Sequence, residues 1–243
     1  MVKIICCFWN PGPYIHNCIK SIKSQTYKDF KVYLIDDMST DNTNESIKSL
    51  INNDDRFVLI TNSEKKFKLK NMDEIIMDEN IIEDEDIIVE LDGDDWFYGD
   101  DVLYFISEKY KNNKNLWLTN GSFVYSNGQI GFSSEVNYKT IRKDVFTFSH
   151  LRTWKAHLWR KIDEESFLDE NGEYFKSAPD VAYSLPMVEI SGKNHYEFIP
   201  KIMLVYNAEN QYNEHKPNSA GGGVSSQQKN AQYIRNKKTY RML

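Results

Sequence analysis

The sequence has few of the features that mark a secreted, membrane-spanning or repetitive protein. It has three cysteines among 243 residues, too few for a disulfide framework, and no cysteine and histidine spacing typical of a zinc site. The apolar run from Ile4 to Trp9 is too short for a signal-peptide core and far too short to span a bilayer. No internal repeat and no linker marks a second domain. We therefore expect a cytoplasmic protein with reduced, mostly buried thiols and no transmembrane segment.

Basic residues are outnumbered by acidic ones, 30 to 36. The formal net charge is −6 and the pI is near 5.5, which argues against a general nucleic-acid binder. An acidic chain can still bind a nucleotide through a metal ion. The 40% hydrophobic and 14% aromatic content over 243 residues is that of a folded protein with a substantial core.

The first hundred residues alternate between strand and helix patterns. Expected strands lie at 3–9, 32–35, 56–61 and 87–91, with helices at 14–25, around 47–51 and at 68–78 between them. This order predicts a parallel sheet covered on both faces. The later chain is expected to elaborate this half, with helices at 101–110, 154–162 and 181–190, strands at 116–118 and 195–206, and a hairpin at 123–132.

Acidic residues follow two of the expected strands. Asp92, Asp94 and Asp95 surround Gly93 directly after an apolar strand, and Asp37 follows the second strand. Solvated acidic turns and helix caps are the simple alternatives. In a parallel sheet, however, both strand ends face one crevice. A carboxylate there can accept the imide N–H of uracil, and a cation among the others can neutralise a diphosphate. The pattern thus favours a nucleoside diphosphate site.

Four segments in register resemble successive blocks of family 2 glycosyltransferases with the GT-A fold. They are residues 4–10, 21–30, 36–43 and 91–95, and a looser resemblance continues through 150–154, 180–189 and 206–207. The resemblance implies a GT-A (Rossmann-like) α/β fold, with a mostly parallel central sheet and helices on both faces. It also implies one domain, residues 1–243, made of a nucleotide-sugar half (1–98), an acceptor half (99–206) and a C-terminal lid or tail (207–243).

On the donor side, the resemblance assigns roles to four residues. Asp37 matches the residue that contacts uracil, and the Trp9 ring lines the base pocket. Asp92 and Asp94 match the Asp-x-Asp motif and are both candidates to hold Mn²⁺ or Mg²⁺, with Asp94 the more direct ligand and Asp92 nearer the ribose. The pocket wall departs from the family pattern, because Cys6-Cys7 replaces the usual small or hydroxylated residues.

Asp180 matches the general base of inverting members, although it follows Ala178-Pro179 rather than the more frequent glutamate. A cap after Pro179 is the structural alternative. Arg152, with His150, falls where phosphate-side or acceptor-side contacts are usual. Two weaker candidates complete the set.

Lys70 opens a helix where family members often touch the nucleotide, and His215 lies in a loop that can supply a further metal ligand. A charged helix surface and a solvated loop histidine are the ordinary readings of these two residues.

The implied function is a metal-dependent, inverting transfer of a sugar from a UDP-sugar to a hydroxyl of a glycan or protein. One carboxylate takes the acceptor proton, and a positive centre stabilises the departing diphosphate. The alternative is a GT-A nucleotide-binding module that has lost catalysis. The absence of a Gln-x-x-Arg-Trp motif argues for single addition. The basic C-terminal stretch could be a lid, a contact with an anionic membrane, or a solvated helix.

Overall fold

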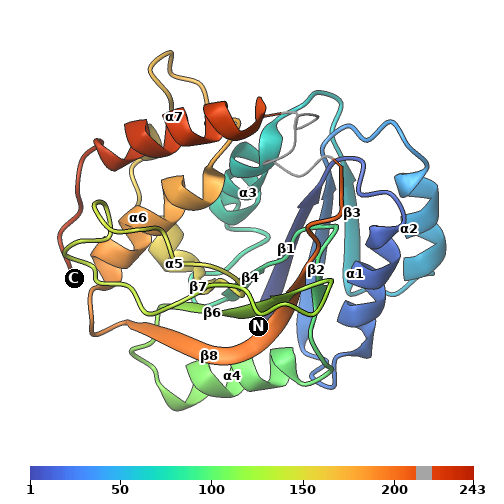
Figure 1. The fold of residues 1–243 in the computed structure, drawn as a ribbon. Helices are drawn as coiled ribbons and strands as arrows, with labels where there is room; N and C mark the ends of the chain where they lie inside the picture. The colour runs from blue at the N-terminus through green and yellow to red at the C-terminus, as the bar shows by residue number, and fades with distance from the viewer. Residues whose placement is uncertain (212–220) are drawn as a thin grey trace.

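The structure, a computed structural model, describes residues 1–211 and 221–243. Figure 1 shows a curved sheet with helices on both sides. The elements are β1 (Val2–Phe8), α1 (Tyr14–Ser24), β2 (Phe30–Asp36), α2 (Thr43–Ile51), β3 (Phe57–Thr61), α3 (Phe67–Met77), β4 (Ile87–Glu90), β5 (Trp96–Phe97), α4 (Val102–Asn112), β6 (Leu118–Tyr125), β7 (Thr153–Lys155), α5 (Ala156–Trp159), the 3-10 helix η1 (Glu164–Phe167), α6 (Pro179–Ser191), β8 (Tyr196–Tyr206) and α7 (Gly223–Arg235).

All eight strands form one sheet in the order β3-β2-β1-β4-β7-β6-β8-β5. The first four in this order are parallel, and β1 pairs with β2 on one side and β4 on the other. β7 runs antiparallel between β4 and β6, whereas β6 and β8 are parallel to each other. The predicted α/β fold with a mostly parallel central sheet is confirmed.

Successive side chains of each strand point to opposite faces of the sheet and pack into a hydrophobic core on each face. In β1, Ile5 and Cys7 pack with α3, α5 and α6, whereas Ile4 and Cys6 pack with α1, α2 and α4. The three cysteines are buried and free, as expected from their positions in β1 and α1. The strands that carry the acidic residues are therefore fixed from both sides.

Two local predictions differ from the structure. Residues 154–162 were expected to be helical, but Thr153–Lys155 form β7 in the middle of the sheet and only Ala156–Trp159 are helical. Three residues carry no strand periodicity of their own, so pairing with β4 and β6 decides their conformation. The hairpin at 123–132 is reduced to a turn and one bridge between Val124 and Ile130.

The C-terminal stretch is packed rather than free after Gly223. Helix α7 lies against α6, and Ile234 is fully buried in the core of that face. Arg142 binds the Glu189 carboxylate through two nitrogens and donates to the backbone carbonyls of Ile234, Lys237 and Lys238. Gly222, directly before α7, adopts a left-handed conformation with φ of 95°, which glycine tolerates without a steric penalty.

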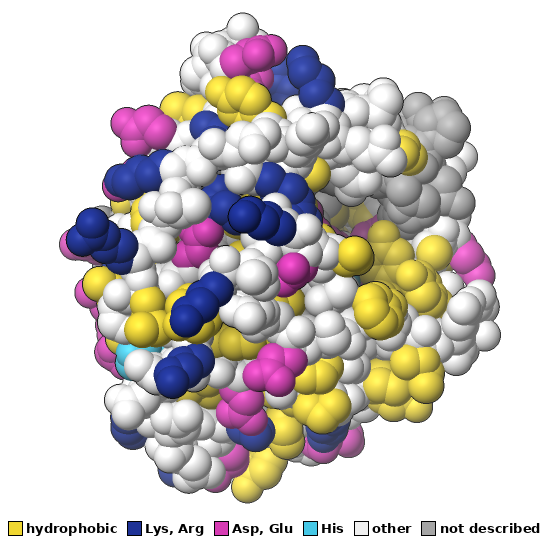
Figure 2. Space-filling view, turned by 60° about the vertical axis from the view of Figure 1, so that its left-hand side comes forward, with side chains coloured by type: hydrophobic (Ala, Val, Ile, Leu, Met, Phe, Trp, Pro, Cys, Tyr) yellow, Lys and Arg dark blue, Asp and Glu magenta, His cyan; other side chains and the backbone are white. Residues whose placement is uncertain are grey.

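Surface charge and apolar groups are separated on one face. In Figure 2, Lys and Arg side chains are spread over the left part of this face, and hydrophobic side chains gather on the right beside a hollow. Among the residues described, no helix combines the length and apolar character needed to cross a membrane.

Replacing Arg142 with Met should detach the C-terminal stretch. The substitution leaves the buried Glu189 carboxylate without its cation, so we expect a loss of about 3 kcal/mol in the free energy of unfolding, measured by urea denaturation. Lys238→Met is the control, because its pair with Asp163 is solvent-exposed, and it should leave the urea midpoint unchanged. Equal urea midpoints for the two variants would show that the contacts of Arg142 with Glu189 and the C-terminal backbone do not hold α7 in place.

Candidate functional site

A cavity of about 260 Å³ lies where β1, β2 and β4 end. Its wall combines aromatic rings, carboxylates and cations from segments far apart in the sequence. The described lining residues are Cys7, Phe8, Trp9, Pro11, Asp37, Lys65, Phe67, Lys68, Asn71, Asp92, Asp94, His150, Arg152, Lys176, Pro179, Asp180, Tyr206, Asn210, Gly221 and Gln227. The carboxyl edge of a parallel sheet is where α/β proteins bind ligands.

The turn after β4 depends on close backbone approach at Gly93. The backbone N–H of Leu91 donates to the Ile5 carbonyl at 3.1 Å, so the chain keeps following β1 beyond the strand. A Cβ at Gly93 would lie 2.5 Å from the Cβ of Phe8, which only glycine avoids. Any side chain at position 93 would push against Phe8 and displace the flanking Asp92 and Asp94.

Of the two aspartates that follow Gly93, Asp95 is buried and Asp94 is half-buried at the cavity wall. Asn210 donates from Nδ2 to Asp94 Oδ2 at 2.8 Å, and the N–H of Asn207 donates to Asp95 Oδ1 at 2.8 Å. Burial and then repulsion from Asp92 raise the pKa of Asp94 to about 6. Burial, followed by repulsion from Asp94 and Asp92, raises the pKa of Asp95 well above its ordinary value. A cation beside Asp94 would relieve this repulsion.

Asp37 fixes the opposite wall of the cavity. It is 5% exposed, and its carboxylate accepts hydrogen bonds from the backbone N–H groups of Lys66 at 2.8 Å and Phe67 at 2.9 Å. The preceding Lys65 places its ammonium 3.9 Å from the centre of the Trp9 ring. The same ammonium lies 3.7 Å from Asp37 Oδ2, so Trp9 and Asp37 lie on the same side of the cavity.

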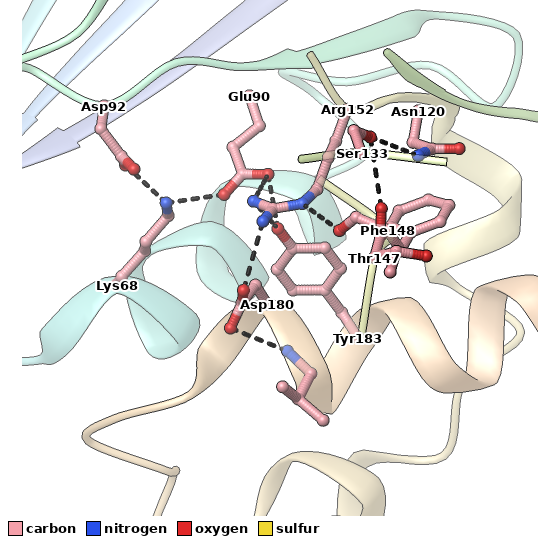
Figure 3. A network of polar contacts seen from close by, with 11 residues as sticks. Lys68, Glu90, Asp92, Asn120, Ser133, Thr147, Phe148, Arg152, Asp180 and Tyr183 are labelled. Atoms are coloured by element: carbon pink, nitrogen blue, oxygen red, sulfur yellow. Dashed lines mark hydrogen bonds and ion pairs between the residues drawn. The ribbon is translucent and has the colours of Figure 1, made fainter. Parts of the chain in front are cut away.

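A chain of buried and half-buried charges runs along the cavity from Asp92 to Asp180 (Figure 3). Lys68 Nζ lies 2.6 Å from Glu90 Oε1 and 2.5 Å from Asp92 Oδ1. Arg152 lies 3.0 Å from Glu90 Oε2 through Nη1 and 3.2 Å from Asp180 Oδ2 through Nη2. The Tyr183 hydroxyl also donates to Glu90, at 2.5 Å.

Glu90 is the centre of this network and is 1% exposed. Burial alone would raise the pKa of its carboxyl, but the charges of Lys68 and Arg152 outweigh burial and hold that pKa below its ordinary value. The single anion therefore positions two cations, one directed at Asp92 and one at Asp180.

The cavity residues fit a divalent cation that is shared with a diphosphate. Within residues 1–211 and 221–243, no three His, Cys, Asp or Glu side chains gather closely enough to enclose a metal. Mg²⁺ in nucleotide sites is usually held by one or two carboxylates together with phosphate oxygens. Asp94 offers such a carboxylate, whereas Asp92 already pairs with Lys68.

The chain matches the model of the family described as "Glycosyl transferase family 2" over residues 3–166. The chain belongs to glycosyl transferase family 2. Its membership confirms the predicted family and enzyme class. Glycosyltransferase GlyG of Streptococcus pneumoniae serotype 4 (strain ATCC BAA-334 / TIGR4) is 23% identical over 253 residues, which cover 79% of each protein.

Solved structures share the fold of this family 2 chain. S. aureus TarS 1–349 in complex with UDP-GlcNAc gives a TM-score of 0.67 at 16% identity, over 86% of this chain and 59% of that one. Mannosyltransferase PcManGT from Pyrobaculum calidifontis, in complex with GDP-Man and Mn²⁺, gives 0.60 at 16% identity, over 88% and 58%. The chain thus spans about three-fifths of the length of each of these two chains.

Most residues that the sequence singled out share one cavity. Trp9, Asp37, Asp92, Asp94, Arg152 and Asp180 all line it. Lys70 is not among the lining residues, because α3 turns Lys68 and Asn71 toward the cavity and Lys70 away from it. His215 lies outside the described residues.

Sequence reasoning missed Lys68, Glu90, Tyr183 and Asn210. Only Glu90 carries a clear signal, since a lone charge at the end of the apolar run Ile87 to Val89 requires a buried partner.

Replacing Glu90 with Gln should cost about 3 kcal/mol of unfolding free energy at pH 7.5, because the substitution leaves the buried Arg152 and the half-buried Lys68 without their shared anion. The folded-state pKa of Glu90 is lowered, so its stabilisation is present above the unfolded pKa near 4.5 and is lost as the pH falls below it. The unfolding free energies of parent and variant, measured by urea denaturation, should therefore converge as the pH becomes acidic. Glu85→Gln, at an exposed ion pair, is the control and should match the parent throughout. A pH-independent difference between parent and Glu90→Gln would contradict the assigned charge.

Proposed function

We propose that this family 2 chain is a metal-dependent, inverting glycosyltransferase that moves a sugar from a UDP-sugar to an acceptor hydroxyl. The observation that carries the proposal is that Asp180 lines the same cavity as Asp94, Asp37 and Trp9. An in-line displacement needs two groups in the same cavity: a base beside the acceptor hydroxyl, and positive charge that stabilises the departing diphosphate. The alternative, a binding module without catalysis, is an outcome of the tests below.

On the donor side, Trp9 and Asp37 would receive the uracil, with the ring stacking on the base. Three protein donors occupy one Asp37 oxygen. The second oxygen receives the Phe67 N–H and lies 3.7 Å from the Lys65 ammonium, beyond hydrogen-bond distance. A carboxylate oxygen has two lone-pair sites, so this second oxygen retains acceptor capacity for an imide N–H. The solved complexes of similar proteins support a nucleotide-sugar donor in general: UDP-GlcNAc for TarS and GDP-Man for PcManGT.

Asp94 would hold the metal, with Asp92 toward the ribose. When bound, Mn²⁺ or Mg²⁺ supplies positive charge to the departing diphosphate. Lys68 lines the cavity beside Asp92 and adds a fixed positive charge near the diphosphate.

On the acceptor side, Asp180 would take the proton of the attacking hydroxyl. The carboxylate lies in the first turn of α6, where the N–H of Val181 donates to Oδ1 at 3.0 Å. Arg152 binds the other oxygen and is itself held by Glu90, so the orientation of the base is fixed from inside the sheet. Three points remain predictions: that the acceptor is a hydroxyl of a glycan or protein, that the chain divides into halves at 1–98 and 99–206, and that the protein is cytoplasmic.

Asp180→Asn should remove the base while keeping the donor cavity intact. We expect kcat for UDP release in the presence of acceptor to fall about 100-fold or more, with the Kd for UDP unchanged. Asp55→Asn, an exposed aspartate outside the cavity, is the matched control and should keep the parent rate. Retention of most activity by Asp180→Asn would place the base elsewhere.

Donor and metal are tested together by thermal denaturation with UDP-, GDP- and TDP-sugars. Ligand that binds the folded state raises Tm by mass action. We expect UDP-sugars with Mn²⁺ to raise Tm, EDTA to abolish most of the shift, and Asp94→Asn to lose the Mn²⁺-dependent part. A shift with GDP-sugars alone would overturn the role of Asp37, and UDP binding without any turnover would favour the binding module.

A further inference from the structure

A second cavity, of about 370 Å³, borders the first. The two share His150, Arg152, Asp180 and Tyr206, and the remaining described lining residues of the second are Phe123, Tyr125, Phe132, Phe146, Ser149 and Ala208. We propose that this second cavity binds the acceptor, and that the acceptor is an uncharged sugar whose ring stacks on its aromatic wall. The inference rests on the proposed function, since it takes Asp180 as the base.

The wall is unusually aromatic for a surface cavity. Phe123, Tyr125 and Tyr206 make edge-to-face contacts with ring centres 5.3 to 5.8 Å apart, and His150 stacks on Tyr206 at 5.6 Å. Phe132 is 73% exposed, although it is a large apolar side chain at the cavity. Exposed aromatic groups beside a hollow mark binding sites, and a pyranose ring presents an apolar C–H face with a rim of hydroxyls.

The charge of the wall argues for a neutral ligand. Among the described lining residues, only Arg152 and Asp180 carry charge, and they pair with each other. Burial and the neighbouring Arg152 lower the pKa of His150 well below its ordinary value, so the imidazole is neutral at pH 7. An anionic acceptor, such as a polyol phosphate, would therefore find no uncommitted cation among these side chains.

The wall is also held in place before any ligand arrives. Phe132 and Phe146 directly precede Ser133 and Thr147, which are tied to each other and to β6. Asn120 Nδ2 donates to Ser133 Oγ at 3.2 Å, and Ser133 Oγ donates to the Thr147 carbonyl at 3.2 Å.

Arg152 extends this anchoring to the base. Its Nε donates to the Phe148 carbonyl at 3.3 Å, while its Nη2 binds Asp180. Arg152 therefore holds both the base and the backbone between Phe146 and Ser149, which line the second cavity. A ring stacked on the wall would bring a hydroxyl to Asp180 in a defined orientation.

Saturation-transfer NMR with methyl glycosides of glucose, galactose and N-acetylglucosamine, in the presence of UDP and Mn²⁺, tests the inference. We expect at least one glycoside to bind alongside UDP, Phe132→Ala to weaken its binding about tenfold, and Phe132→Trp to restore it. Val145→Ala removes an equally exposed apolar side chain outside both cavities and should change nothing. The Kd for UDP, measured by calorimetry, should be the same in all four proteins.

Several outcomes would overturn the inference. These are unchanged glycoside binding in Phe132→Ala, displacement of the glycoside by UDP, binding of glycerol 3-phosphate but no glycoside, and no glycoside binding while UDP still binds. Failure of UDP itself to bind the parent would instead refute the proposed function.

Discussion

The site depends on one buried carboxylate, that of Glu90 at the end of the central strand β4. A buried anion is stable only with compensating charge, and here Lys68 and Arg152 supply it. Each cation also pairs with a second carboxylate: Lys68 with Asp92, and Arg152 with Asp180. The electrostatic requirement of the core thereby sets the positions of the residues that we assign to the donor and to the base.

Two cavities meet at this network. The first carries the carboxylates and Trp9, which suit a nucleoside diphosphate, and the second carries an aromatic wall, which suits a sugar ring. Asp180 lines both cavities, so a hydroxyl in one and an anomeric carbon in the other could meet beside it. The family supplies the enzyme class, while the side chains of the second cavity supply the basis for acceptor choice in this chain.

The sequence predicted the parallel half of the fold because its strands and helices are long enough to carry their own periodicity. The shared cavity followed from the rule that parallel strands end at one edge, which brought Asp37 and Asp94 together. β7 could not be predicted, because three residues acquire strand structure only from their neighbours. The position of Lys68 rather than Lys70 at the cavity could not be predicted, because packing sets the rotational phase of a short helix. The wall around Phe132 lies in a segment without periodicity, so only tertiary hydrogen bonds define it.

The most direct test of the account is a crystal structure of the protein with UDP and Mn²⁺, read by anomalous scattering from manganese. We predict a manganese peak at the Asp94 carboxylate, shared with the diphosphate, and uracil between Trp9 and Asp37. A nucleotide bound outside this cavity, or an ordered UDP with no manganese at Asp94, would contradict the central claim that this cavity is a metal-dependent sugar-transfer site.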